Sequence, residues 1–219
     1  MRILTWNIER VKRGKADILL ALQKFDADIL VLTETNTSIY PGEEYNCLAT
    51  HELPLFFDGV HYKPGEKRTT IWTKYPIIGS IPTYDNYTNV CAVADTEFGN
   101  LKIYGTIIGV FGGKGERFKA DLTATLSDLK EINRDDSLCF AGDFNTFLSG
   151  YAYPSYSARQ ALREVFKELD LDCLTADIEK NVDHIAMNRH FTENKTISIE
   201  TWNRDFKLSD HVGICLTII

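Results

Sequence analysis

The sequence predicts a mixed α/β fold, made mainly of β-sheets with few helices, and three observations support this. Short alternating apolar runs, broken by Pro-Gly, Tyr-Pro and Asp-Asn pairs, fill residues 45–95. Three other segments, 14–25, 116–133 and a stretch starting near residue 157, read as amphipathic helices. Residues 29–32 are apolar throughout, as expected for a strand that is covered on both faces.

Composition limits the class of protein. With 219 residues, 44% of them hydrophobic, the chain is long enough to bury a sizeable core, and we expect one domain over residues 1–219. Five cysteines without a CxxC pair argue against a disulfide framework or a zinc knuckle. The net charge of -7 disfavours indiscriminate binding to polyanions. Because strand-like residues begin at Arg2 and no apolar run is long, we expect neither a signal peptide nor a membrane span. We also expect the protein to be cytoplasmic and monomeric.

The N-terminal residues 1–9 alternate as a strand. Asn7 and Glu9 lie on one side of it at its C-terminal end, where they form an amide–carboxylate pair. A basic run follows at once, which either keeps a turn solvated or meets a phosphate. Its members are Arg10, Lys12, Arg13 and Lys15.

The next elements are a helix and a buried strand. In the helix over 14–25, Ile18, Leu19 and Leu22 face the core. The apolar strand 29–32 then runs into Thr33 and Glu34, so an acidic group stands where a buried strand stops. A lone Glu at such a place is more often a solvated loop residue than a ligand.

The middle of the chain supplies further strands and a second helix. Residues 69–72 form the clearest strand, preceded by a basic loop with Lys67 and Arg68. Residues 90–94 and 101–110 read as adjacent strands. The glycine-rich residues 112–115 lack the Walker spacing and are expected to be a connector. The helix over 116–133 follows.

The strand over 138–145 ends in Ala-Gly-Asp-Phe-Asn. Alternation places Asp143 and Asn145 on the same side and Phe144 in the core. This pair makes either a hard-oxygen site, for a divalent metal or for a phosphate and a water, or an ordinary Asp/Asn turn.

An aromatic-rich loop follows the strand, and its rings either stack a base, form a hydrophobic lid or pack in the core. Ser157 and Gln160 fit a capping box for the third helix. The remaining strands are expected at 171–174, 182–187, 196–202 and 212–219. The aromatic residues of the loop are Phe147, Tyr151, Tyr153 and Tyr156.

Five motifs together resemble one family. They are Thr5-Trp6-Asn7, Leu32-Thr33-Glu34, Gly142-Asp143-Phe144-Asn145, Val182-Asp183-His184-Ile185 and Ser209-Asp210-His211. In order and spacing they resemble the endonuclease/exonuclease/phosphatase superfamily, which includes DNase I-like nucleases, abasic-site endonucleases, sphingomyelinases and inositol-polyphosphate 5-phosphatases. The resemblance implies a DNase I-like four-layer α/β sandwich: two packed, mostly antiparallel sheets flanked by helices, with the site at one rim.

The resemblance also implies the roles of the site residues. Glu34 would be the main Mg²⁺ ligand, with Mn²⁺ as a possible substitute, and the metal side would be completed by Asn7, Glu9 and Asp210. His211 would be the base or a phosphate-stabilising imidazole, and Asp183 would fix its tautomer. Asp143 would orient the attacking water and Asn145 would bind a phosphate oxygen. Candidate substrate-binding residues are Arg10, Lys12, Arg13 and Arg68.

One position departs from the family pattern. Many relatives carry a His, and abasic-site endonucleases a Tyr, where our alignment gives Ile107. From the five motifs together we expect a Mg²⁺-dependent phosphoester hydrolase, and specifically a nuclease for DNA or RNA. The alternatives are a hydrolase for a small phosphorylated molecule or lipid, and a catalytically weakened module that binds nucleic acid or a phospho-ligand.

Overall fold

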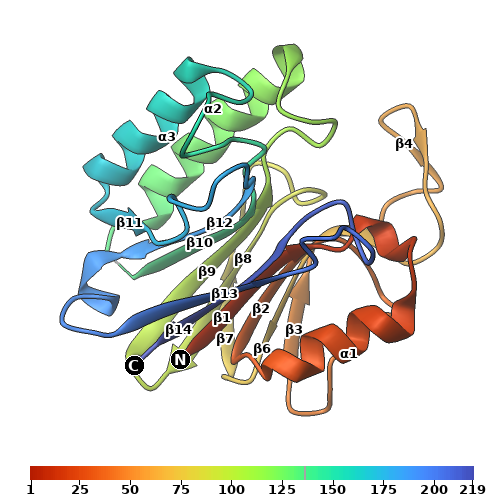
Figure 1. Ribbon diagram of the computed structural model, residues 1–219, viewed down its shortest axis with the longest axis horizontal. Helices are drawn as coiled ribbons and strands as arrows, with labels where there is room; N and C mark the ends of the chain where they lie inside the picture. Colours follow the sequence, from red (N-terminus) through yellow and green to blue (C-terminus); the bar gives the residue numbers. More distant parts are fainter. Residues whose placement is uncertain (136) are drawn as a thin grey trace.

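The computed structural model describes residues 1–135 and 137–219 and has four layers (Figure 1). Helix α1 (Lys15–Phe25) covers the outer face of one sheet. Helices α2 (Gly115–Ile132) and α3 (Tyr156–Glu168) cover the outer face of the other sheet. The two sheets pack against each other between these helical layers, which confirms the expected four-layer sandwich.

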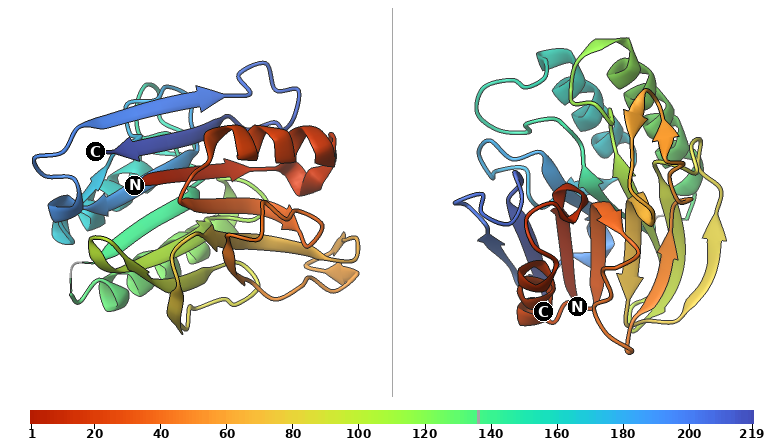
Figure 2. Two further views of the ribbon diagram at one scale, coloured as in Figure 1. Left: turned by 90° about the horizontal axis from the view of Figure 1, so that it is seen from below. Right: turned by 90° about the vertical axis from the view of Figure 1, so that its right-hand side faces the viewer.

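The first sheet has the strand order β13-β14-β1-β2-β6-β3. Its strands are β1 (Arg2–Asn7), β2 (Ile29–Asn36), β3 (Asn46–Ala49), β6 (Glu66–Thr73), β13 (Ile197–Trp202) and β14 (Gly213–Ile218). Only β1 and β2 pair in parallel, and the register of Asn7 with Thr33 brings their C-terminal ends level at one edge of the sheet. The chain termini lie side by side in Figures 1 and 2, where Met1 N donates to Ile218 O.

The second sheet has the order β11-β12-β10-β9-β8-β7. Its strands are β7 (Ile77–Ile81), β8 (Val90–Thr96), β9 (Gly99–Ile107), β10 (Leu138–Asp143), β11 (Leu171–Cys173) and β12 (Asp183–Asn188). Strands β9 and β10 run parallel and the other pairs antiparallel. A separate hairpin, β4 (Phe56–Phe57) and β5 (Val60–His61), projects beyond the sheets in Figure 1.

Alternating side chains divide the core into three clusters. On β1, Ile3 faces the second sheet, whereas Leu4 and Trp6 face α1. On β10, Phe140 packs under α2 and α3, while Cys139 and Ala141 lie between the sheets. These two inner strands therefore contribute to two apolar layers each, which is why inner strands read as nearly continuous apolar runs.

The structure corrects three details of the sequence-based assignment. Strand β1 ends at Asn7, and Glu9 begins a 3₁₀ turn, η1 (Glu9–Val11), with φ of 48° at Glu9, so Glu9 is not on the strand face. Strand β10 ends at Asp143, and Asn145 has φ of 46°. The cap of α3 is Ser155, whose Oγ accepts from Ala158 N, and not Ser157.

The last short element is the 3₁₀ turn η2 (Arg189–Phe191). None of the helices in the described residues is both long enough and apolar enough to cross a membrane.

Candidate active site

The C-terminal ends of β1, β2 and β10 meet at one rim of the sandwich, and the amide of Asn7 joins the two sheets there. Its Nδ2 lies 3.3 Å from Glu34 Oε1 on the first sheet and 3.3 Å from Asp143 Oδ2 on the second. Asn7 and Asp143 are buried and Glu34 is partly buried. Residues 7, 34 and 143, which are far apart in sequence, therefore form one polar cluster.

An acid–imidazole pair completes the cluster. His211 Nδ1 lies 2.6 Å from Asp183 Oδ2, a short charge-assisted contact. Because Nδ1 is engaged, Nε2 faces the rest of the site, 4.0 Å from Asp143 Oδ2 and 3.9 Å from Asp210 Oδ1. The predicted pairing of Asp183 with His211 is thus present in the geometry, with Asp183 at the start of β12 and His211 in the loop before β14.

The backbone around His211 is fixed by neighbouring side chains. Ser209 Oγ donates to Asn7 O at 2.6 Å and accepts from His211 N at 3.1 Å. Trp6 Nε1 donates to His211 O at 3.1 Å. Two residues of β1 therefore hold the Ser-Asp-His segment against the strand that carries Asn7.

The charges of the site perturb one another. Burial lowers the pKa of His211, but the carboxylates of Asp183, Asp143 and Asp210 outweigh it and raise that pKa to about 10. Burial, together with Asp183 and Glu34, raises the pKa of Asp143 to about 7, against the opposing effect of His211. Without a cation in the site, the imidazole is thus protonated at neutral pH and the Asp143 carboxyl is poised between its two forms.

Glu34 has the properties of a cation ligand. Burial and the nearby Asp210 raise its pKa, although the Asn7 amide opposes this, and within residues 1–135 and 137–219 it forms no ion pair with Lys or Arg. Its φ of 45° is left-handed, a conformation that costs a non-glycine residue free energy and is enriched at functional sites. No group of three or more His, Cys, Asp or Glu side chains in the described residues is arranged to hold a metal. The carboxylates of Glu34 and Asp210 fit Mg²⁺, which keeps most of its waters. The amide of Asn7 presents its nitrogen to Glu34, and its oxygen accepts from Glu9 N at 3.0 Å.

Two predicted site residues have other partners. The carboxylate of Glu9 lies 2.6 Å from Arg13 Nε and 3.6 Å from Lys12 Nζ, so its charge is already compensated. Asn145 N donates to Asp143 Oδ1 at 2.9 Å. The amide nitrogen of Asn145 donates to the carbonyls of Ile108 and Gly109, both at 3.1 Å, and so anchors the loop after β9.

The four predicted substrate-binding cations all have carboxylate partners. Arg10 contacts Glu66 at 2.6 Å, and Arg68, which is buried, contacts Asp58 at 2.7 Å. Lys12 and Arg13 share Glu9 but keep substantial exposure. Much of the positive charge of these four side chains is therefore compensated within the protein.

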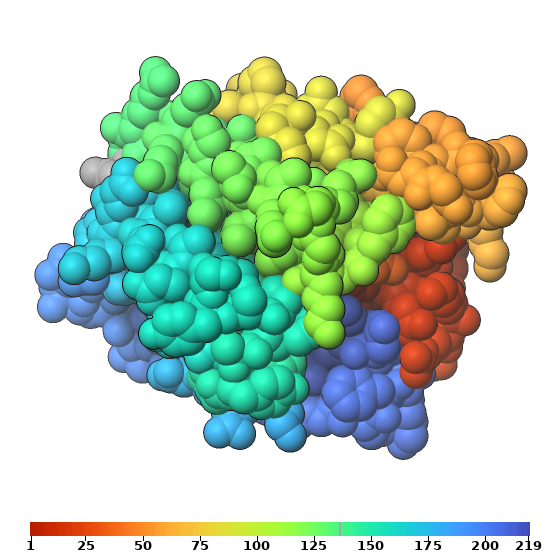
Figure 3. All heavy atoms as spheres, turned by 90° about the horizontal axis from the view of Figure 1, so that it is seen from above, coloured from red at the N-terminus to blue at the C-terminus, as the bar shows by residue number. Residues whose placement is uncertain are grey.

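Two pockets flank the polar cluster. One of about 140 Å³ contains Glu34, Arg10, Tyr62, Lys67 and Ile107 among its lining residues, so the aliphatic Ile107 faces the site. In Figure 3 the surface is hollowed between the yellow-green segment near residue 110, the red N-terminal segment and the blue C-terminal segment.

The second pocket, of about 280 Å³, is lined by Asp183, His211 and Lys180 together with aromatic side chains. Neither Lys67 nor Lys180 forms an ion pair within the described chain, which leaves one uncompensated cation in each pocket. Sequence reasoning missed Lys180; its position three residues before Asp183 was the available signal.

Comparisons with known proteins place this geometry in context. The model of the Endonuclease/Exonuclease/phosphatase family matches residues 4–211. No curated protein matches the chain in sequence.

Solved structures are similar over nearly the whole chain. The endonuclease domain of TRAS1, a telomere-specific non-LTR retrotransposon, has a TM-score of 0.73 at 15% identity, covering 99% of this chain and 97% of that one. An AP endonuclease from Archaeoglobus fulgidus has a TM-score of 0.71 at 13% identity, with 100% and 99% covered. A 3'-5' exonuclease from Neisseria meningitidis has a TM-score of 0.72 at 14% identity, with 100% and 99% covered. At these identities the likeness shows the fold alone.

Proposed function

The chain belongs to the endonuclease/exonuclease/phosphatase family, and from this premise we propose that it is a divalent-metal-dependent phosphoester hydrolase whose substrate is a nucleic-acid phosphodiester. The observation that carries the proposal is the convergence of two chemically different groups at one rim. The pair of Asp183 and His211 faces Asp143, and the Asn7 amide links Asp143 to Glu34. Phosphoester hydrolysis needs both halves: groups that handle protons and a carboxylate that holds a cation.

His211 acts as a donor to a phosphate oxygen. Asp183 accepts the proton on Nδ1 and holds the ring, so Nε2 points toward the place where the phosphate would lie. In the metal-free protein the surrounding carboxylates raise the pKa of His211 to about 10, against the effect of burial, so the ring carries a proton on both nitrogens at neutral pH. Of the two roles expected for His211, the phosphate-stabilising one fits this charge state.

Asp143 accepts the proton of the attacking water. The Asn7 amide and the Asn145 backbone N–H hold its two oxygens in place. A carboxyl whose pKa is raised, mainly by burial, to about 7 is well matched to a general base that works near neutral pH. Asn145 then serves to fix Asp143, since the amide nitrogen of Asn145 is occupied by two carbonyl groups.

Glu34 would hold the metal ion, with Asn7 and Asp210 beside it. When bound there, Mg²⁺ or Mn²⁺ supplies positive charge that neutralises the charge developing on the phosphate oxygens. Glu9 does not belong to this ligand set, because Arg13 and Lys12 already neutralise its carboxylate.

The choice of nucleic acid rests on two supports. Several similar structures are of enzymes whose names refer to DNA processing, among them an AP endonuclease and a Neisseria 3' phosphatase bound to a product DNA hairpin. In addition, Lys67 lies in the pocket that contains Glu34 and Lys180 in the pocket that contains His211, so a strand longer than one phosphate could contact both cations.

A binding module is the second candidate, favoured by the position of Ile107 in the pocket beside Glu34. A screen of single-stranded and duplex DNA, RNA, sphingomyelin and inositol phosphates, with Mg²⁺ and with EDTA, separates the candidates. We expect Mg²⁺-dependent cleavage of at least one nucleic acid. Binding of nucleic acid without product release would establish the module instead, and turnover of only the small or lipid substrates would overturn the choice of nucleic acid.

A further inference from the structure

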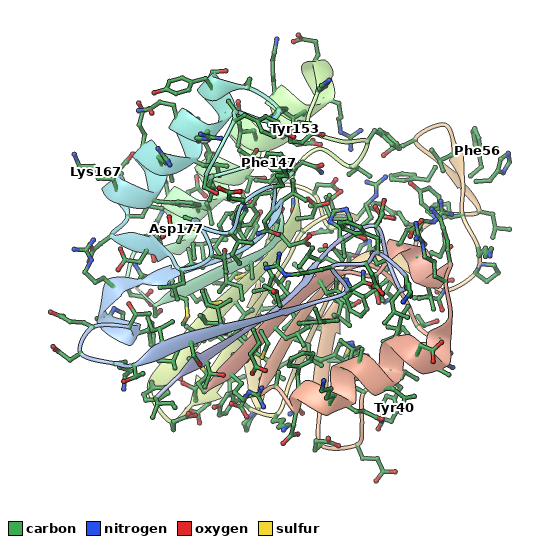
Figure 4. The ribbon with its side chains drawn as sticks, in the orientation of Figure 1. Tyr40, Phe56, Phe147, Tyr153, Lys167 and Asp177 are labelled. Atoms are coloured by element: carbon green, nitrogen blue, oxygen red, sulfur yellow. The ribbon has the colours of Figure 1, made fainter. Side chains whose placement is uncertain are left out.

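The loop between Asn145 and α3 places an aromatic wall beside the acid–imidazole pair. The rings of Phe147 and Tyr153 lie with centroids 5.0 Å apart, and Phe147 N donates to Tyr153 O at 2.8 Å. Both residues line the 280 Å³ pocket that also contains Asp183 and His211. Figure 4 shows the two side chains together, between α3 and the rim of the sheets.

This loop is held by one buried guanidinium. Arg159 on α3 is only 8% exposed and donates to four carbonyls, those of Phe147, Ser149, Gly150 and Tyr151, at 2.6–3.1 Å. No carboxylate pairs with Arg159 in the part of the chain that the structure describes. A buried charge that is satisfied only by carbonyls of one loop fixes that loop in one conformation, because each lost contact would leave a charged donor unpaired.

The helix contributes a second contact of the same kind. Arg163 Nη2 donates to Leu148 O at 2.6 Å, so every carbonyl from 147 to 151 accepts a bond from an α3 arginine. Regular secondary structure satisfies none of these carbonyls, so without the arginines they would have to find water. The shape of the aromatic wall therefore depends on α3.

The chemistry of the pocket selects a planar group attached to a phosphate. The pocket has aromatic side chains for stacking, those of Phe147, Tyr153 and the partly exposed Phe206. Lys180 supplies a cation, and His211 lies where the proposed mechanism binds the phosphate. The volume of about 280 Å³ lies just below the ~300–1,000 Å³ usual for ligand pockets, so the pocket suits a single planar ring system. A polyhydroxylated ring would leave its hydroxyls against aromatic faces, whereas a nucleobase stacks there whatever its sequence identity.

We propose, building on the proposed function, that this pocket binds the nucleobase next to the scissile phosphate by stacking on Phe147 and Tyr153, and that Arg159 is a positioning residue for that wall. His211 lines this pocket together with Phe147 and Tyr153, whereas none of these three residues lines the pocket beside Glu34. One of the two nucleosides that flank the phosphate is therefore stacked and the other is not.

Two dinucleoside monophosphates test this without any hydrolysis. Each contains thymidine and the fluorescent base 2-aminopurine, placed 5' of the phosphate in one isomer and 3' in the other. In EDTA, titration with the wild-type protein is expected to quench one isomer strongly and the other little, since stacking on an aromatic ring quenches this base. Equal quenching of both isomers, or of neither, would overturn the proposal.

Variants locate the effect. Phe147→Leu is expected to weaken binding of the quenched isomer at least about fivefold, the loss typical of one base–aromatic stack. Tyr156→Leu is the matched control, since that ring begins α3, is 70% exposed and does not line the pocket. Equal losses in both variants would refute a stack on Phe147.

Arg159 is tested by separating binding from turnover. Arg159→Met should raise the KM for the dinucleoside phosphate about fivefold or more. It should change the KM little for thymidine methyl phosphate, in which a methyl group replaces the nucleoside that would stack. Arg159→Lys should restore part of the affinity, since it keeps the charge but not the four-way fork. Equal effects on both substrates, without rescue, would make Arg159 a stability residue only. Base-dependent quenching in a protein that hydrolyses nothing would support the pocket and refute the proposed function.

Discussion

The contact between Asp183 and His211 gives the most quantitative prediction. The carboxylate lies 2.6 Å from the imidazole Nδ1 and raises the pKa of His211, against the effect of burial, toward about 10. A hydrogen bond to a charged group contributes ~1.5–3 kcal/mol. At ~1.36 kcal/mol per pKa unit, Asp183→Asn should lower the pKa of His211 by about 1–2 units.

The assay is an NMR titration of the imidazole carbon-bound protons in metal-free protein. The His211 signal is identified by its absence in His211→Gln. Asp177→Asn is the matched control because Asp177 is an exposed carboxylate before the same strand (Figure 4). An unchanged His211 inflection in Asp183→Asn, or an equal shift in the control, would refute the assignment of Asp183 as the group that sets the charge of the ring.

Turnover provides the second half of this prediction. In the proposed mechanism the two residues act as one unit, so Asp183→Asn should reduce kcat by about 10²–10⁴-fold, the range for positioned acid–base groups. His211→Ala added to Asp183→Asn should cause little further loss. Losses that multiply in the double variant would show that the two residues work independently.

Two further predictions concern salt and acid. Replacing Lys12 and Arg13 with Ser should raise the KM for an oligonucleotide and flatten the log–log salt dependence of its cleavage by at most about 0.7–0.9 per lost phosphate contact. Lys130→Ser is the control, because Lys130 is an ion-paired lysine on α2, and it should change neither quantity. Identical salt curves would reject a role of Lys12 and Arg13 in substrate binding. Burial lowers the pKa of His184 from its usual 6.5 to about 4. As the pH falls from 6.5 to 4, the imidazole is therefore protonated mainly in the unfolded chain, and about 3 kcal/mol of folding stability should be lost. Urea unfolding of His184→Gln should show a shallower decline over this range, and an equal decline would contradict the assignment.

The sequence was informative wherever a strand continued. Alternation placed Asn7 correctly on the inner face of β1, and the apolar run before Glu34 correctly predicted a buried strand. The same rule was wrong for Glu9 and Asn145, because both have positive φ just beyond a strand end and their side chains leave the strand face. Alternation holds only while the backbone is extended.

Contacts between distant residues were beyond sequence reasoning. The basic run after β1 left open whether it keeps a turn solvated or meets a phosphate, and the pairing of Arg10 with Glu66 depends on how β6 lies beside β2. The sequence analysis did not single out the buried Arg159. Its burial follows from the path of the loop that precedes α3, which no periodic pattern specifies.

The central claim is that hydrolysis depends on a divalent cation held at Glu34. The most direct test measures cleavage of one oligonucleotide against Mg²⁺ concentration for the wild type, Glu34→Gln and the control Glu44→Gln, whose carboxylate does not line either site pocket. We predict Mg²⁺-dependent cleavage by the wild type and the control, and none by Glu34→Gln, with cooperative thermal unfolding in all three. Cleavage by Glu34→Gln with an unchanged Mg²⁺ dependence would contradict the claim.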